Sequence, residues 1–378
     1  MALPANVQQS EHDLEMENGS AKRTNLLVFR DVCEHKSGKG LRAGLERVVQ
    51  SVLDNPNDCE RKLDALIRAG ELESALADCQ SMAAIPFSHL TDQLAAALLD
   101  SEDHSGEIAG SWQTLSRVPF PETLAISAPE GFAYYALHPM DFAIWGRNTL
   151  RHNAPAAVIG IRNIGATLSA VVTVAFRAQG RDAERMTVRP DGHPYDRITN
   201  LSATQEGWIR QQSYRSAEFY IVDEGPGLSG SSFLSVGEAL VRSGVPAEKI
   251  TFVGTHEPDP RALCTANAVV RWGRFDSTTV TPRTYGRLPR SADLSGGGWR
   301  GLLLDPSTDW PACWPQMERL KLLSPDGKRL LKFEGLGRFG QEAREERGHI
   351  LASAGFTFHP EEADDGLTAY PFCEGKPI

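Results

Sequence analysis

Two adjacent acids, Asp223 and Glu224, follow an apolar segment, Phe219–Val222, and precede a loop of glycine and serine. Glycine lets a ligand approach the backbone closely, and the N–H groups of a small-residue loop that opens a helix attract anions. The two carboxylates accept hydrogen bonds from vicinal hydroxyls, directly or with a divalent cation nearby. The pattern therefore predicts a ribose 5-phosphate site. The loop residues assigned to its phosphate are Gly225, Gly227, Ser229, Gly230, Ser231 and Ser232.

This segment resembles the signature of the type I phosphoribosyltransferases. In that family a hydrophobic strand, two acids and a Gly/Ser/Thr-rich loop hold the 5-phosphate of phosphoribosyl pyrophosphate. The resemblance implies that Asp223 and Glu224 are catalytic residues that hold the ribose hydroxyls together with Mg²⁺. Glu224 replaces the more usual second Asp. Gly227 and Leu228 stand where many members carry a further acid that acts on the base.

An upstream segment, Val158–Ala166, is similar to the pyrophosphate loop of the same family. There a strand leads into a basic residue and a glycine turn that opens a helix. The resemblance implies that Arg162, Asn163 and Gly165 contact the pyrophosphate, with the guanidinium supplying charge-assisted hydrogen bonds.

Between these two loops, Arg189–Arg197 is polar and rich in turn residues, as the family's flexible lid would be. A lid that closes over the reaction centre excludes water and supplies charge at the leaving pyrophosphate. Arg189 and Arg197 are the charges that the resemblance implies, and His193 is a candidate proton donor to the base.

The resemblance leaves two functions open. One is a phosphoribosyltransferase, a pentosyltransferase that uses phosphoribosyl pyrophosphate and Mg²⁺ to transfer ribose 5-phosphate to an unidentified base or amine. The other is a non-catalytic nucleotide-sensing or nucleotide-binding module on the same fold, which the missing loop acid favours. The sequence does not identify the acceptor. It also leaves the oligomeric state open, and a homo-oligomer is compatible with it.

The elements that must position these loops alternate along the middle of the chain. Short apolar runs predict strands, and longer segments between them predict helices. The predicted strands are Ala156–Ile161, Arg185–Val188, Phe219–Val222, Ile250–Gly254 and Ala268–Arg271, and the predicted helices are Ala166–Arg177, Ser232–Ser243 and Pro260–Ala266. The alternation predicts an α/β fold with a doubly wound parallel sheet, which binds ligands at the carboxyl ends of its strands.

Three further segments flank this predicted domain, which we expect to span residues 111–290. Residues 1–24 lack an apolar period and predict a disordered tail. Residues 25–110 form a helical segment, because apolar residues recur at helical spacing on both sides of a break at Asn55–Pro56. Residues 291–378 predict a small α+β segment.

The C-terminal segment contains the pattern GxGxxG at Gly335–Gly340. The preceding strand carries Lys332 and Glu334 where a buried parallel strand would be apolar, which disfavours a dinucleotide site. The segment more closely resembles part of the amino lobe of aminoglycoside-phosphotransferase-like kinases. The residues that carry this likeness are Lys332, a glutamate-rich helix with Glu342, Glu345 and Glu346, and the strand Gly366–Phe372. The catalytic lobe has no counterpart here, so we expect no kinase activity.

Composition narrows the function classes further. The 378 residues include 39 Lys and Arg against 49 Asp and Glu, a net charge of −10, which argues against nucleic acid as a partner. The longest apolar runs fall far short of the roughly 20 residues of a membrane helix, so no membrane partner is expected. Six cysteines without CxxC spacing favour reduced thiols and a cytoplasmic protein.

Overall fold

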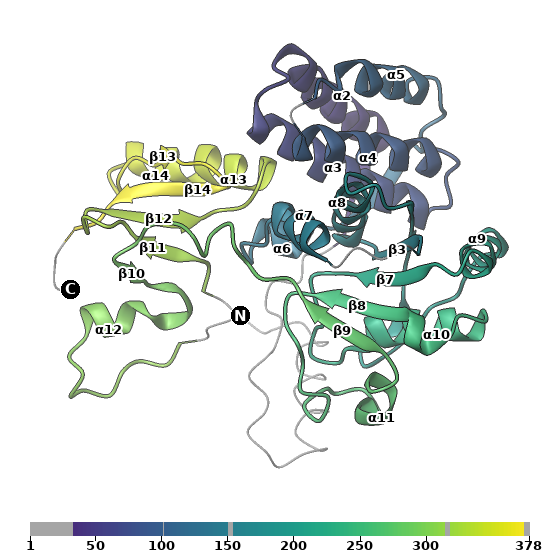
Figure 1. Cartoon of the computed structure of the whole chain (residues 1–378). Coiled ribbons are helices and arrows are strands. Elements are labelled where there is room, and N and C mark those ends of the chain that lie inside the picture. Colours follow the sequence, from purple (N-terminus) through teal and green to yellow (C-terminus); the bar gives the residue numbers. More distant parts are fainter. Residues whose placement is uncertain (1–32, 101, 150–153, 314–317, 374–378) are drawn as a thin grey trace.

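A five-stranded parallel sheet forms the centre of the computed structural model (Figure 1). The structure describes residues 33–100, 102–149, 154–313 and 318–373. The strands lie in the order β4-β3-β7-β8-β9 and are parallel throughout. Their bounds are Ala156–Ile161 (β3), Ala183–Val188 (β4), Glu218–Val222 (β7), Ile250–Gly254 (β8) and Asp276–Thr279 (β9). The predicted α/β fold with a doubly wound parallel sheet is confirmed.

Successive side chains of the central strands point to opposite faces of the sheet, as strand geometry requires. Ile159 and Ile221 are buried in a cluster with Phe233, whereas Val158 and Val222 are buried in the cluster on the other face. The first face is covered by α9 (Ala203–Tyr214) and α10 (Ser231–Arg242), and the second by α7 (Pro139–Asn148) and α8 (Gly165–Arg177). Burial on both faces explains why these strands are continuous apolar runs.

The prediction of a strand at Ala268–Arg271 is wrong, because this segment forms α11 (Ala268–Trp272). Ala268 and Trp272, four residues apart, are buried, while Val269 and Val270 are exposed. A short apolar run cannot distinguish a helix from a strand by periodicity alone. The fifth strand is the polar β9, which pairs with β8.

The prediction of a helix at Pro260–Ala266 is also wrong, because turns occupy this segment. The Asp259 carboxylate accepts a hydrogen bond from the Arg261 backbone N–H at 3.0 Å. The Cys264 N–H donates to the carbonyl of Leu228 at 3.1 Å. The backbone of this segment therefore supports the loop after β7 instead of continuing a helix.

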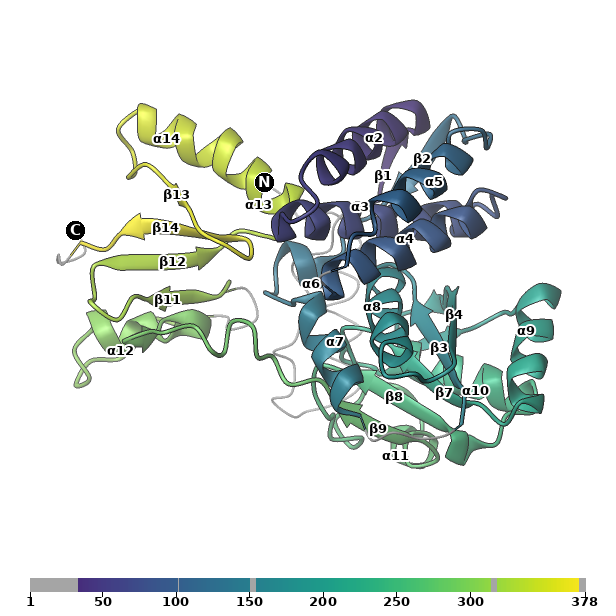
Figure 2. The same ribbon diagram turned by 45° about the horizontal axis from the view of Figure 1, so that its top comes forward.

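The N-terminal helical segment packs against α8 (Figure 2). Its helices are α2 (Gly38–Asp54), α3 (Cys59–Asp78), α4 (Ala84–Leu99) and α5 (Ser105–Leu115). The strands β1 (Glu34–Ser37) and β2 (Thr123–Ile126) form an antiparallel pair beside them, and the short α6 (Glu130–Ala133) follows. A Cβ on Gly70 of α3 would lie 2.1 Å from the Thr167 hydroxyl of α8, so the two helices are in close contact.

A buried ion cluster also joins the helical segment to the sheet. Arg185 of β4 donates hydrogen bonds to both carboxylate oxygens of Glu73, at 2.8 and 2.9 Å, and a further one to Asp92. The side chains of Arg185 and Glu73 are each 3% exposed. Because two acids face one guanidinium, this buried positive charge is fully matched.

The C-terminal segment is a separate antiparallel sheet in the order β10-β11-β12-β14-β13. Its strands are Ala292–Asp293 (β10), Lys321–Leu323 (β11), Arg329–Phe333 (β12), Glu361–Glu362 (β13) and Leu367–Pro371 (β14). Its helices are α12 (Trp299–Leu303), α13 (Arg338–Glu342) and α14 (His349–Ser353). Antiparallel pairing around β12 excludes the parallel unit that a dinucleotide-binding GxGxxG loop requires.

The GxGxxG turn instead joins the C-terminal segment to the helices. The N–H of Leu336 donates to the Phe132 carbonyl at 2.9 Å, and the N–H of Arg338 donates to Asp64 of α3 at 2.9 Å. The guanidinium of Arg338 pairs with Glu71 of the same helix. In the part compared with kinases, Lys332 pairs with Glu334 at 2.8 Å. The side chains of Glu342, Glu345 and Glu346 lie outside those that the structure describes.

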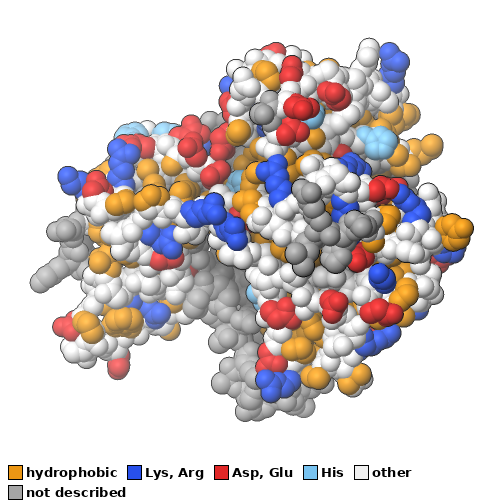
Figure 3. All heavy atoms as spheres, in the orientation of Figure 1, with side chains coloured by type: hydrophobic (Ala, Val, Ile, Leu, Met, Phe, Trp, Pro, Cys, Tyr) orange, Lys and Arg blue, Asp and Glu red, His pale blue; other side chains and the backbone are white. Residues whose placement is uncertain are grey.

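Acidic, basic and hydrophobic side chains are intermixed on the face of the molecule shown in Figure 3. Within the described ranges, every helix is too short or too polar to cross a membrane.

Candidate functional site

The loops after β3 and β7 start at the carboxyl edge of the sheet, where the strand order changes direction. β3 leads into α8 on one face, and β7 leads into α10 on the other. The two connections therefore diverge from neighbouring strands, which is the arrangement at which open α/β sheets bind ligands. The sequence-predicted residues Arg162–Gly165 and Asp223–Ser232 both lie at this point.

Asp223 and Glu224 are half-buried, and their carboxyl groups lack full charge compensation. Burial raises the pKa of Asp223 to about 7, although the charges of Arg189 and Arg197 act in the opposite direction. Burial raises the pKa of Glu224 to about 8, and the charges of Asp223 and Glu130 add to this effect. The pair would therefore gain from a ligand that donates hydrogen bonds or brings positive charge.

Glu224 occupies a confined position under α6. Its Oε2 is buried and accepts no hydrogen bond from the described residues. A Cβ on Gly131 would lie 2.4 Å from this oxygen, 2.8 Å from Ile164 and 3.0 Å from Leu137. The Thr255 hydroxyl donates to the Glu224 carbonyl at 2.6 Å and holds the backbone in place. The Gly131 backbone offsets the burial of this carboxyl group only in part, since the pKa of Glu224 remains raised.

The glycines of the loop after β7 serve different purposes. Gly230 has φ +64°, and a Cβ there would lie 3.0 Å from Leu263 and 3.1 Å from Trp272. A Cβ on Gly225 would lie 2.9 Å from the Gly227 nitrogen. Gly227 is exposed and a Cβ there would contact nothing within 4 Å. Gly225 and Gly230 are therefore required by the fold, and Gly227 leaves open space beside the loop.

The start of α10 combines helix amides with serine hydroxyls. Gly230 is the N-cap and provides no side-chain cap. Ser229 and Ser231 are buried, and both hydroxyls donate to the carbonyl of Pro194, at 2.8 and 2.6 Å. Ser232 is half-buried in the first turn of the helix. Pro194 lies in the hairpin of β5 (Asp191–His193) and β6 (Asp196–Ile198), so this hairpin is closed onto the predicted phosphate loop.

The structure brings Arg197 of this hairpin near the acid pair but gives His193 a different environment. The charge of Arg197 acts on Asp223, and its Nη1 donates to the Pro190 carbonyl at 3.3 Å. His193 is exposed, and its Nδ1 accepts a hydrogen bond from the Tyr195 N–H at 3.2 Å. The described contacts of His193 thus lie within the hairpin.

The loop after β3 is held by an acid that the sequence did not single out. Asp78, the last residue of α3, accepts hydrogen bonds from Arg162 at 2.8 Å and from Arg189 Nε at 3.1 Å. Arg189 also donates to the Arg162 carbonyl at 2.6 Å. Burial lowers the pKa of Arg162, and its Nε is buried without an acceptor among the described residues. The carboxylate of Asp78 thus occupies the position where the two arginines would bind an anion.

The other two residues assigned to this loop make contacts within the chain. The Asn163 side chain donates to the carbonyls of Ser127 and Ala128, at 3.0 and 2.8 Å. A Cβ on Gly165 would lie 3.0 Å from the Val222 carbonyl oxygen, so glycine allows α8 to start close to β7. No sequence pattern marked Asp78, because it lies about 80 residues upstream in a helix of the preceding segment.

The acid pair fits a role beside a magnesium ion. Mg²⁺ takes oxygen ligands in an octahedral arrangement and commonly keeps waters and substrate phosphates among them. Among the described residues no cluster of three or more His, Cys, Asp or Glu could hold a metal. Asp223 and Glu224 would therefore supply two carboxylates at most, and ligand oxygens and water would supply the rest.

The chain was compared with models of protein families, with curated proteins and with solved structures, and none of them matches it.

Proposed function

We propose that the edge of the sheet beyond β3 and β7 binds phosphoribosyl pyrophosphate and that the chain is a phosphoribosyltransferase. The observation that carries the proposal is the acid pair Asp223 and Glu224, whose pKa values burial raises, beside the glycine N-cap of α10. Carboxylates accept hydrogen bonds from the ribose 2- and 3-hydroxyls, and helix amides with serine hydroxyls bind the 5-phosphate. Two unlike subsites next to each other fit this ligand.

The reaction would replace one bond at the anomeric carbon of the ribose. A nitrogen of the acceptor forms the new bond, the bond to pyrophosphate oxygen breaks with its electron pair, and the acceptor proton passes to water. Arg162 and Arg189 would bind the leaving pyrophosphate, and Asp223 with Glu224 would hold the ribose. Mg²⁺, when bound, would screen the charge of the pyrophosphate against the two carboxylates.

Binding would require two internal contacts to be exchanged for contacts with the ligand. Ser229 and Ser231 would release the Pro194 carbonyl, and Arg162 and Arg189 would release Asp78. The hairpin β5–β6 would then act as the lid. Closure of such a lid over the bound ligand excludes water from the reaction.

A second function is favoured by the same internal contacts. A module that only senses a nucleotide needs no open pyrophosphate subsite, and Asp78 already pairs with both arginines there. On this alternative, ligand binding at the acid pair and the serine loop would occur without transfer. The departure from the family at Gly227 and Leu228, where many members carry an acid, favours it as well.

Two measurements on the full chain test the proposal. Calorimetric titration with phosphoribosyl pyrophosphate and MgCl₂ measures binding, and a coupled assay measures pyrophosphate released with a panel of bases and amines. Binding with release supports the transferase, and saturable binding without release supports the sensor. Absence of binding contradicts both.

A matched pair of double variants tests the residues. Asp223→Asn with Glu224→Gln should weaken binding at least tenfold, because the amides replace two charged acceptors. Asp182→Asn with Glu184→Gln makes the same chemical change at the amino end of β4, where both acids pair with Arg215, and should leave binding unchanged. Equal binding by the wild type and the first variant would remove the site.

A further inference from the structure

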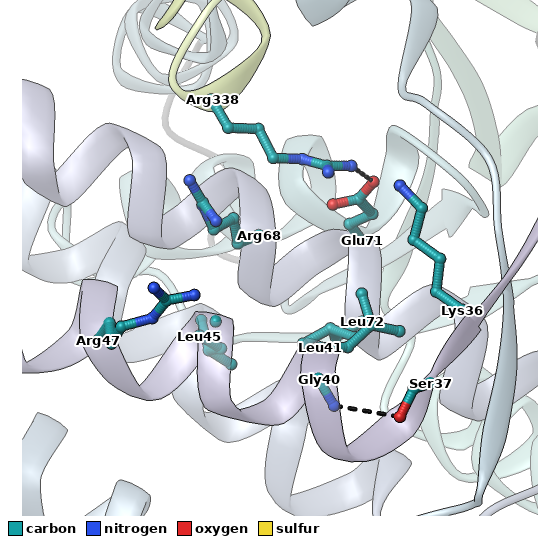
Figure 4. Close-up of a pocket in the computed structure, with 11 residues that line it drawn as sticks. Lys36, Ser37, Gly40, Leu41, Leu45, Arg47, Arg68, Glu71, Leu72 and Arg338 are labelled. Carbon is teal, nitrogen blue, oxygen red and sulfur yellow. Dashed lines mark hydrogen bonds and ion pairs between the residues drawn. The ribbon is translucent and has the colours of Figure 1, made fainter. Parts of the chain in front are cut away.

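A cavity lies between β1, α2, α3 and the first residue of α13, and it shares no lining residue with the site around Asp223. Its volume is about 300 Å³. Lys36, Arg47, Arg68 and Arg338 line it together with one acid, Glu71 (Figure 4). Its apolar lining is formed by Leu41, Leu45 and Leu72. Four cationic side chains from three parts of the chain therefore surround an apolar floor.

The cations on one side of this cavity are held so that their terminal nitrogens remain available. Arg47 donates from Nε to the Ala43 carbonyl at 3.4 Å, and Arg68 donates from Nε to Asp64 at 3.0 Å. Figure 4 shows the two guanidinium groups on neighbouring helices, one above the other. Such a pair of groups can bind two oxygens of one phosphate.

On the other side of the cavity, acidic side chains pair with the two remaining cations, Lys36 and Arg338. Arg338 pairs with Glu71, and the charge of Lys36 acts on the same carboxylate. Lys36 also pairs with Glu34 at 2.9 Å. Glu34 and Asp64 do not line the cavity, so Glu71 is the acid among its lining residues. Four cations and one acid line the cavity, although Arg68 is itself paired with Asp64 at 3.0 Å and its charge also acts on Glu71.

Two glycines of α2 keep the cavity open. A Cβ on Gly44 would meet nothing within 4 Å, and one on Gly40 would meet only Ser37, at 3.8 Å or more. Gly38, by contrast, has the Pro121 carbonyl 1.9 Å from a Cβ position, so packing requires it. Glycine weakens a helix interior relative to alanine. Packing does not account for Gly40 and Gly44, whereas space for a ligand does.

We propose that this cavity binds a phosphomonoester of nucleotide size, with the phosphate on Arg47 and Arg68 and the organic part on the floor of Leu41, Leu45 and Leu72. The volume lies at the lower end of the range for ligand pockets, about 300 to 1,000 Å³. Because the turn at Arg338 closes one side, the ligand would contact both the N-terminal helices and the C-terminal segment. It would be a ligand in addition to that of the proposed transferase site.

The test uses adenosine 5′-monophosphate as the probe and the full chain carrying Asp223→Asn with Glu224→Gln, in which binding at the other site is weakened. Calorimetric titration should detect saturable binding of the probe. Adenosine, which lacks the phosphate, should bind at least tenfold more weakly. Arg47→Ala with Arg68→Ala should reduce the affinity for the monophosphate at least tenfold, whereas Arg210→Ala with Arg261→Ala, at exposed sites elsewhere, should not.

A steric variant provides an independent check that does not remove charge. Gly44→Leu should fill the cavity and abolish binding without lowering the midpoint of thermal unfolding, because leucine is the better helix former. Gly110→Leu is the matched control on α5, where a Cβ also meets nothing within 4 Å. If the monophosphate fails to bind, or binds all four variants as it binds the parent chain, the proposal is wrong.

Discussion

Two groups of ionisable side chains lie on opposite sides of strand β3, and they differ in how their charges are matched. Arg185 on β4 is faced by two acids and donates at least three hydrogen bonds to them. Burial alone would lower the pKa of Arg185, but Asp92 and Glu73 raise it. Asp223 and Glu224 beyond β7 have no such partner close by, and burial raises the pKa of both, to about 7 and about 8.

The difference separates a structural role from a ligand-binding role. A buried charge whose partners are all present stays ionised and fixes the arrangement of the elements that carry it. Buried acids that titrate near neutral pH are stabilised by whatever supplies the missing donors, which makes them candidates for a functional site. On this basis the Arg185 cluster holds the helices to the sheet, and the Asp223 pair is the group that we propose as a ligand site.

The loss of Arg185 tests the structural role of its ion cluster. Among the changes considered, it should have the largest effect on the free energy of unfolding. Arg185→Ala leaves Glu73 and Asp92 buried without their partner, so the free energy of unfolding should fall by about 3 to 5 kcal/mol. Urea denaturation followed by circular dichroism measures it. Arg177→Ala, which removes a 44% exposed partner of Asp92, is the control and should cost less than about 1 kcal/mol. Equal effects of the two variants would contradict the assignment.

The pH dependence of the free energy of unfolding tests the second group, Asp223 and Glu224. An acid whose pKa is raised by folding holds its proton longer in the folded state, so stability is greatest below about pH 4 and falls as the pH rises towards 7 and 8. Replacing both acids, by Asp223→Asn with Glu224→Gln, should remove this fall, which we expect to be of the order of 2 kcal/mol.

Urea denaturation of the wild type and of this double variant between pH 4 and pH 8.5 provides the measurement. The double variant should be as stable as the wild type at pH 4 and more stable at pH 8. A wild type that gained stability relative to the variant over this range would show that the two carboxylates are matched after all.

Asp78 gives the candidate site an ion cluster like that of Arg185, because it pairs with Arg162 and Arg189 in the absence of a ligand. Asp78→Asn should raise the affinity for phosphoribosyl pyrophosphate roughly tenfold, about 1.4 kcal/mol, because the ligand no longer competes with a carboxylate. Asp54→Asn, at the last residue of α2, is the matched control. Unchanged affinity in Asp78→Asn would exclude this acid from the site.

Two of the glycines in the loop after β7, Gly227 and Gly230, provide the comparison with the smallest expected effect. Gly230→Ala should destabilise the fold by about 1 kcal/mol, because alanine is strained at φ +64° and its Cβ would approach Leu263. Gly227→Ala should leave stability unchanged within about 0.5 kcal/mol, since its Cβ contacts nothing. Thermal unfolding of the two variants under the same conditions distinguishes a structural glycine from one that leaves room for a ligand.

The sheet could be predicted from the sequence where its strands are apolar on both faces. The predicted strands Ala156–Ile161 and Ile250–Gly254 match the structure at both ends. Their successive side chains alternate between the two buried clusters on the two faces of the sheet. The edge strand Asp276–Thr279 could not be predicted, because Asp, Ser and Thr have no apolar period. The nearby run at Ala268–Arg271 was more apolar but is helical.

The sequence alone predicts only part of the candidate site. Asp223, Glu224 and the loop to Ser232 are contiguous, so their proximity follows from the chain itself. The Pro194 carbonyl on the serines and Asp78 on the two arginines come from other elements, and tertiary packing alone brings them there. Sequence reasoning assigned Asn163 and Gly165 to ligand binding by their position in the loop, whereas their contacts hold the loop to its neighbours.

The ion pair between Arg338 and Glu71 joins residues 267 positions apart. Burial raises the pKa of Glu71, and Arg338 is the first of the charges that oppose this effect. During synthesis Glu71 is made long before Arg338, so its carboxyl group lacks this partner until the last quarter of the chain has been made. Such a group favours the protonated or solvent-exposed state, and the last quarter of the chain therefore completes the packing of the first.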